Sequence, residues 1–172
     1  RFEASRPDST AGLPGINEAV ACSKPNAVPW TGGGFTEASQ ACAARGPSYR
    51  LCTLPESENA CRSLADTNYP YGASYQATAC NGVDAAPGAA VATGSTATCV
   101  TAENAFDLSG NVAEWTATQT NTPSAAPDRI FALAGGSYLS PEIGLACTID
   151  LEPRALETTL LPNIGFRCCK DP

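Results

Sequence analysis

Apolar residues in this chain occur in short runs, and two of the runs have the spacing and the end signals of a helix. The first spans residues 36–45, where Thr36 is a candidate N-cap and Gly46 follows as the stop. The stripe that would face the core consists of Ala38, Ala41 and Cys42. We therefore predict a short helix over these residues.

A second helix is predicted from about Leu54 to Leu64, because its start has the residues of a capping box. Thr53 stands at the cap, a proline follows in the first turn, and Glu56 comes three residues after the cap. The apolar side of this helix would carry Ala60, Cys61 and Leu64. This orientation presents Cys61 to the interior.

The remaining pattern predicts short strands separated by long loops. Residues 1–34 are rich in Pro, Gly and Asn and indicate irregular chain with room for one edge strand. Residues 66–128 show no sustained helical period, and the part from 116 to 128 is expected to be an exposed polar excursion. Strands are predicted at residues 130–133, before a Gly-Gly pair, and at residues 164–169. We divide the chain into an irregular N-terminal segment, residues 1–34, packed on a single domain of residues 35–172.

Nine cysteines without any Cys-x-x-Cys pair indicate disulfides between distant segments, and hence an oxidising, extracellular location. Cys80 and Cys99 flank one loop and are a candidate pair. The neighbours Cys168 and Cys169 are expected to have two separate distant partners, with a bridge from one of them to Cys147 favoured. The odd number leaves one cysteine free, capped, bound to a ligand or bonded to another chain. The full connectivity stays open at this point.

The composition argues against several classes of partner and of catalytic site. Seventeen acidic and ten basic residues give a net charge of −7, which disfavours nucleic acid and anionic membranes as partners. The sequence contains no His, which removes His general bases, His-activated nucleophiles and zinc sites that need imidazole. No apolar run approaches the roughly 20 residues that span a bilayer, so no direct membrane span is predicted.

Three motifs follow one another along the chain. Residues 50–53 read Arg-Leu-Cys-Thr, residues 106–115 read Phe-Asp-Leu-Ser-Gly-Asn-Val-Ala-Glu-Trp, and a Gly-Gly-Ser-Tyr element at 135–138 precedes Gly-Phe-Arg at 165–167. Together they resemble the formylglycine-generating-enzyme-like family, also called the sulfatase-modifying-factor domain, whose core is related to the C-type lectin fold. Ser57 departs from the family's helix motif, which has Trp there. The resemblance implies a loop-rich α+β domain with two short helices, short antiparallel strands and several disulfides.

The resemblance also implies a calcium site in the second motif. Asp107 and Glu114 are hard oxygen donors on either side of a Gly-Asn turn whose carbonyls can face inward, a ligand set that suits Ca²⁺. Carried over by position, the implied ligands are the side chains of Asp107 and Glu114 and the carbonyls of Gly110 and Val112. On spacing alone, the alternative is a turn in which Glu114 accepts backbone N–H groups and Trp115 fills the core.

Active members of this family oxidise a substrate cysteine to formylglycine with two cysteines that bind copper(I), a soft metal suited to thiolates. Carried over by position, those two cysteines correspond to Ser140 and Leu145 in this sequence, and the nearby Cys147 cannot supply two thiolates. Copper is therefore not expected, and no catalytic residue is assigned.

We predict a secreted or cell-surface, non-catalytic binding or structural module whose partner is a protein subunit or a surface glycan or polymer. Loops at residues 116–128 and 140–161 would carry recognition. A second chain that completes the domain, joined through the unpaired cysteine, is also expected, because the glycine-rich opening strand usual in the family is absent. The alternative is a copper-dependent formylglycine-generating oxidase, or a related oxygen-using enzyme, with a site rearranged around Cys147.

Overall fold

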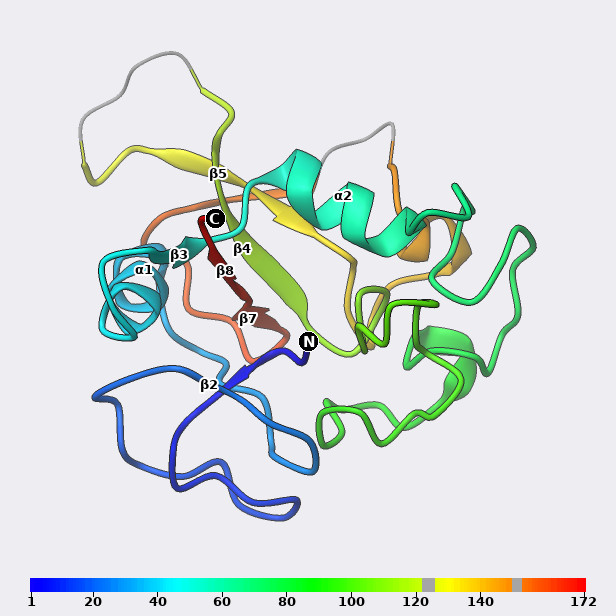
Figure 1. Ribbon diagram of the computed structural model, residues 1–172, viewed down its shortest axis with the longest axis horizontal. Coiled ribbons are helices and arrows are strands. Elements are labelled where there is room, and N and C mark those ends of the chain that lie inside the picture. Colours follow the sequence, from blue (N-terminus) through cyan, green and yellow to red (C-terminus); the bar gives the residue numbers. More distant parts are fainter. Residues whose placement is uncertain (122–125, 150–152) are drawn as a thin grey trace.

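The computed structural model describes residues 1–121, 126–149 and 153–172, which form a mixed α+β, loop-rich domain. Figure 1 shows one long strand, β4, through the middle of the molecule, with the helices α1 and α2 on two sides of it and green loops filling the right. Both predicted helices are present, as α1 (Phe35–Ala43) and α2 (Leu54–Arg62).

Helix α1 begins two residues earlier than the predicted N-cap implies. Its N-cap is Gly34, which makes no side-chain capping bond, so the prediction of Thr36 as N-cap was wrong. The reason is Phe35, whose ring stacks on Phe131 at 3.5 Å between centroids and whose N–H donates to the carbonyl of Glu157. This packing fixes the first turn without a polar cap. The predicted inward stripe of Ala38, Ala41 and Cys42 is buried.

Helix α2 has the predicted capping box. The Glu56 N–H donates to Thr53 Oγ1 at 3.3 Å, and the Thr53 N–H donates back to Glu56 Oε2 at 2.7 Å. The predicted apolar side was wrong in part, because Ser57 and Cys61 are buried whereas Ala60 is exposed and Leu64 is 94% exposed. The helix ends at Arg62, and a left-handed φ of 54° at the next residue turns the chain before Leu64 can follow the helical face.

The largest sheet has four strands in the order β6-β5-β4-β7. These strands are β6 (Arg154–Leu156), β5 (Ile130–Ala134), β4 (Ala113–Gln119) and β7 (Ile164–Phe166). The β5 prediction is confirmed, and the predicted C-terminal strand divides into β7 and β8 (Cys168–Lys170). Strand β7 runs parallel to β4, so the expectation of antiparallel strands holds for the other pairs only.

Two small antiparallel pairs complete the strands. Strand β1 (Ala4–Ser5) pairs with β2 (Cys22–Ser23), and β3 (Tyr49–Leu51) pairs with β8. The predicted polar excursion at residues 116–128 begins later than expected, because β4 continues to Gln119 and Thr116 is completely buried. Part of that excursion, residues 122–125, lies outside the described residues.

The core lies between α1 and the β4–β7 part of the sheet. It contains both tryptophans, Trp30 and Trp115. The ring of Trp30 meets that of Phe166 edge to face, with centroids 5.5 Å apart. Three residues of the N-terminal segment also contribute to this core: Ala4, Ala21 and Trp30. Nothing in the described residues forms a helix long and apolar enough to cross a membrane.

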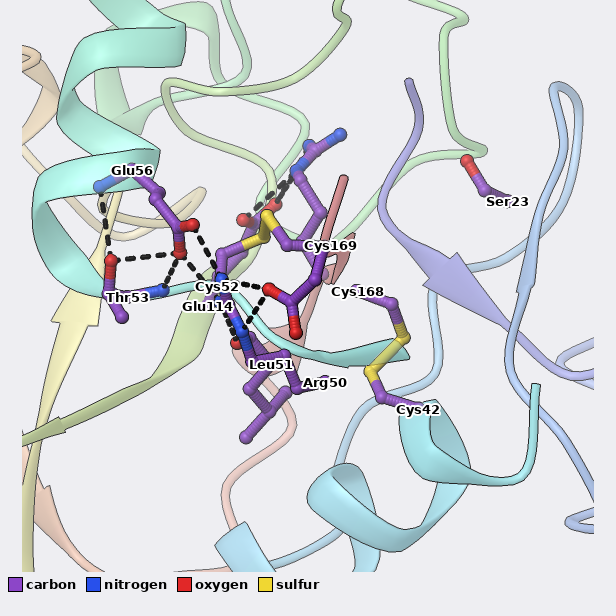
Figure 2. Close-up of a disulfide and its surroundings, with 12 residues drawn as sticks. Ser23, Cys42, Arg50, Leu51, Cys52, Thr53, Glu56, Glu114, Cys168 and Cys169 are labelled. Carbon is purple, nitrogen blue, oxygen red and sulfur yellow. Dashed lines mark hydrogen bonds and ion pairs between the residues drawn. A yellow bond between two sulfur atoms is a disulfide. The ribbon is translucent and has the colours of Figure 1, made fainter. Parts of the chain in front are cut away.

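Four disulfides join segments that are distant in the sequence: Cys42–Cys168, Cys52–Cys169, Cys61–Cys147 and Cys80–Cys99. The Cys80–Cys99 bridge and the separate partners of Cys168 and Cys169 are confirmed. Figure 2 shows these two neighbours reaching in different directions, as side chains alternate along a strand. The bridge predicted from one of them to Cys147 was wrong, because α2 presents Cys61 to Cys147. Cys22 is the free cysteine.

Candidate functional site

The predicted calcium element, residues 107–114, is a tight turn that leads into β4. Asp107 and Asn111 have left-handed backbones, with φ of 55° and 61°, and Gly110 has a φ of 77°. A Cβ at Gly110 would lie 2.4 Å from the carbonyl oxygen of Asn81, which in turn accepts the Asn111 N–H at 2.8 Å. The glycine is therefore required here by both conformation and space.

The side chain of Asn111 links this turn to two other segments. Its Nδ2 donates to Glu3 Oε2 at 2.7 Å and to the carbonyl of Val91 at 3.1 Å. Its Oδ1 accepts from Asn81 Nδ2 at 3.0 Å and from the Val91 N–H at 2.8 Å. Since all its polar atoms are bonded to protein, Asn111 holds the turn in place rather than offering a binding group.

Glu114, the last residue of the calcium element, forms a buried ion pair with Arg167. Arg167 Nη2 lies 2.8 Å from Glu114 Oε1, and Arg167 Nε lies 3.1 Å from both carboxylate oxygens. Both side chains are almost completely buried. Arg167 Nη2 also donates to the carbonyl of Phe106 at 2.8 Å, which ties the Gly-Phe-Arg motif to the start of the calcium element.

Two further carboxyl groups are buried beside this pair. Burial, followed by the charges of Asp107 and Glu114, raises the pKa of Glu3 well above its usual value. Burial also raises the pKa of Asp107 to about 6, although the Gly94 N–H at 2.6 Å from Asp107 Oδ2 opposes the shift. Nothing in the sequence pattern singled out Glu3. It directly precedes β1, and its hydrogen-bond partners, Asn111 and Val112, lie more than a hundred residues later in the chain.

As these side chains lie, they do not fit a calcium ion. Both oxygens of Glu114 are taken by Arg167, and Asp107 is held by a backbone N–H. Within residues 1–121, 126–149 and 153–172, no group of three or more His, Cys, Asp and Glu side chains is placed to hold a metal. The calcium ligand set of Asp107, Gly110, Val112 and Glu114 stays a prediction.

The positions of the family's copper cysteines lie in the loop that follows the Gly-Gly-Ser-Tyr element. Ser140 Oγ accepts the Ser137 N–H at 2.9 Å, and Leu145 is buried at the end of the short 3-10 helix η2 (Glu142–Leu145). Cys147 is bonded to Cys61. All nine cysteines lie in the described segments, and Cys22 is the one outside a disulfide. This donor set does not fit a two-thiolate copper(I) centre.

The Gly-Gly pair brings this loop close to the calcium element. Gly136 has a φ of 67°, and a Cβ there would lie 2.1 Å from the carbonyl oxygen of Gly144. The preceding Gly135 accepts the Gly110 N–H at 2.7 Å. Gly136 thus allows a close backbone contact within its own loop, and Gly135 joins that loop to the calcium element.

Comparison with known proteins identifies the family of this chain. A family model described as the sulfatase-modifying factor enzyme 1-like domain matches residues 9–172. The chain therefore belongs to the sulfatase-modifying factor enzyme 1-like family, as the sequence motifs indicated. No curated protein matches the chain.

Solved structures show the same fold at low sequence identity. PvdO from Pseudomonas aeruginosa is 16% identical with a TM-score of 0.67, and the match covers 100% of this chain and 71% of that one. Treponema denticola variable protein 1 is 18% identical with a TM-score of 0.58, over 72% of this chain and 48% of that one. CarF is 23% identical with a TM-score of 0.53, over 70% and 46%. The matched region spans about half the length of the latter two structures.

Proposed function

We propose that this chain is an extracellular, non-catalytic binding or structural module on a sulfatase-modifying-factor scaffold. The observation that supports the proposal is the lack of a thiol pair at the positions where active family members bind copper. Ser140 and Leu145 replace the copper-binding pair, and Cys147 is held in a disulfide with Cys61. An oxidase rearranged around Cys147 would first need that bridge to be reduced.

The extracellular location is supported by the four disulfides. Such bridges form and persist in oxidising compartments and are rare where thiols are kept reduced. Two of them close separations of 126 and 117 residues and thereby tie the C-terminal strand to the first half of the chain. The partner we propose is a protein subunit or a surface glycan or polymer, with Cys22 available for a bridge to a second chain.

Copper(I) competition tests the non-catalytic part. The native protein is mixed with copper(I) and bathocuproine disulfonate, and oxygen consumption is followed with a cysteine-containing peptide. We expect no copper retained by the protein and no oxygen uptake. A variant with Ser140→Cys and Leu145→Cys restores two thiols at the family's positions and serves as the matched control for copper retention. One copper per native chain together with peptide-dependent oxygen uptake would overturn the proposal.

Calcium is tested separately. The family resemblance predicts that EGTA lowers the melting temperature and that Glu114→Gln abolishes the difference. The Glu114–Arg167 pair instead predicts equal melting with EGTA and with excess calcium, because Arg167 already supplies the positive charge. Calorimetric melting in both conditions decides between the two.

A further inference from the structure

One face of the molecule combines half-buried aromatic side chains with exposed aliphatic and acidic ones. It is built where residues 68–84 lie beside residues 138–147, joined by bonds from the Cys147 N–H to the Asn68 carbonyl at 2.8 Å and from the Val83 N–H to the Ser140 carbonyl at 3.1 Å. In Figure 1 this is the right side, where green loops approach the orange segment. We call it the aromatic–acidic face; its members are Tyr71, Tyr75, Val83, Asp84, Leu139, Glu142 and Ile143.

Two tyrosines form the aromatic part, and a third lies beneath them. Tyr69 is buried, with Tyr71 stacked on it at 5.5 Å and Tyr75 tilted against it at 5.7 Å between centroids. Tyr71 and Tyr75 remain half-buried. Because Tyr69 supports both outer rings, they are held in place rather than free to turn.

Two carboxylates stand next to these rings. Tyr75 donates its hydroxyl hydrogen bond to Asp84 at 2.8 Å, and the negative charge of Glu142 acts on all three tyrosines. Both carboxylates are exposed. The aliphatic part is exposed as well, with 48% of Val83, 58% of Leu139 and 68% of Ile143 open to solvent.

The sequence leaves this face without positive charge of its own. Residues 63–128 and 130–153 contain no Lys or Arg, so neither segment of the face supplies a cation to balance Asp84 and Glu142. Aromatic rings attract cations through their faces, and the attraction is stronger where carboxylates lie close by. The complementary ligand is therefore a cation that carries apolar surface.

We propose that the aromatic–acidic face binds a Lys- or Arg-bearing segment of a partner protein. The cationic head would lie between Asp84 and Glu142 and over an outer tyrosine ring, and an apolar neighbour in the partner would cover Leu139 and Ile143. The inference rests on the proposed function as a binding module and names its partner class. A neutral oligosaccharide fits less well, because it leaves both carboxylates without a countercharge and because Tyr69 already covers one face of Tyr71.

The experiment is an NMR titration of the native protein with an end-blocked peptide that contains two Lys and two Leu. The same peptide with Glu in place of Lys is the control ligand, and chitotriose represents neutral sugars. We expect amide shifts in residues 68–84 and 138–147 with the Lys peptide, smaller shifts with added salt, and none with the other two ligands.

Variants localise the interaction. Asp84→Asn combined with Glu142→Gln should weaken peptide binding by about fivefold or more. The matched control removes two exposed carboxylates elsewhere, Glu18→Gln with Asp171→Asn, and should change the affinity by less than about twofold. Both doubles change the net charge equally, and unchanged melting temperatures would show that each folds.

Three outcomes overturn the inference: equal weakening by both doubles, shifts mapped to other residues, or binding of chitotriose instead of the peptide. A negative result here leaves the cysteine-based proposal standing, since that fails only through copper retention and oxygen uptake.

Discussion

Replacing Arg167 with Met removes the guanidinium that neutralises buried Glu114. Breaking a buried ion pair from one side costs about 3–5 kcal/mol, because the remaining charge is left without a partner. The lost bond to the Phe106 carbonyl adds about 1 kcal/mol. For a chain of 172 residues, each kcal/mol lowers the melting temperature by about 2–4 °C, so the decrease should be about 8–24 °C.

Urea unfolding followed by circular dichroism, with the disulfides intact, measures the free energy of unfolding. The variants are Arg167→Met, Glu114→Gln and the two combined. Since both substitutions disrupt the same contact, the double variant should be more stable than the sum of the single losses predicts, by about 1–3 kcal/mol. Arg62→Met breaks a solvent-exposed pair with Asp66 and should cost less than about 0.5 kcal/mol.

Two results would refute this reasoning. One is a loss below about 1 kcal/mol for Arg167→Met, which is the range of an exposed pair. The other is strict additivity in the double variant, which would mean that the two groups contribute independently.

Three other predictions concern single positions. Bonding to Arg50 lowers the pKa of Glu56 from 4.5 to about 2, so the wild type should lose stability as pH falls from about 4.5 towards 2, whereas Glu56→Gln should lose that pH dependence. Its side chain is 40% exposed, so the ion pair should contribute less than about 1 kcal/mol and melting between pH 2 and 7 would show a small change. Alkylation of the native protein followed by mass spectrometry should label Cys22 alone; a second labelled site would contradict the four bridges. Gly136→Ala should destabilise by about 2 kcal/mol more than Gly32→Ala, because both have positive φ but only Gly136 has a carbonyl in the way; equal losses in urea would disprove the close contact.

Local signals in the sequence were sufficient where the structure depends on neighbours in the chain. The capping box at Thr53 and Glu56 and the loop closed by Cys80 and Cys99 both act over short separations. The family motifs likewise predicted the fold.

Long-range packing explains what the sequence did not show. The burial of Glu3 depends on Asn111, 108 residues away, and no periodicity reports such a contact. The inward orientation of Cys61 was predicted correctly, but its bridge to Cys147 spans 86 residues, and no local pattern indicates which distant cysteine meets it. The motif of the calcium element was recognised from the sequence. The sequence did not show that Arg167, which belongs to another motif, pairs with the carboxylate of Glu114.

The position of Cys168 and Cys169 has a consequence for biosynthesis. Their partners Cys42 and Cys52 are translated 126 and 117 residues earlier, so both early thiols wait unpaired while most of the polypeptide emerges. During that interval they can oxidise with each other, and the mispaired product must be reshuffled by thiol exchange before β8 can dock on β3. Recombinant yield should therefore depend on a disulfide isomerase in the host more than on the supply of oxidant.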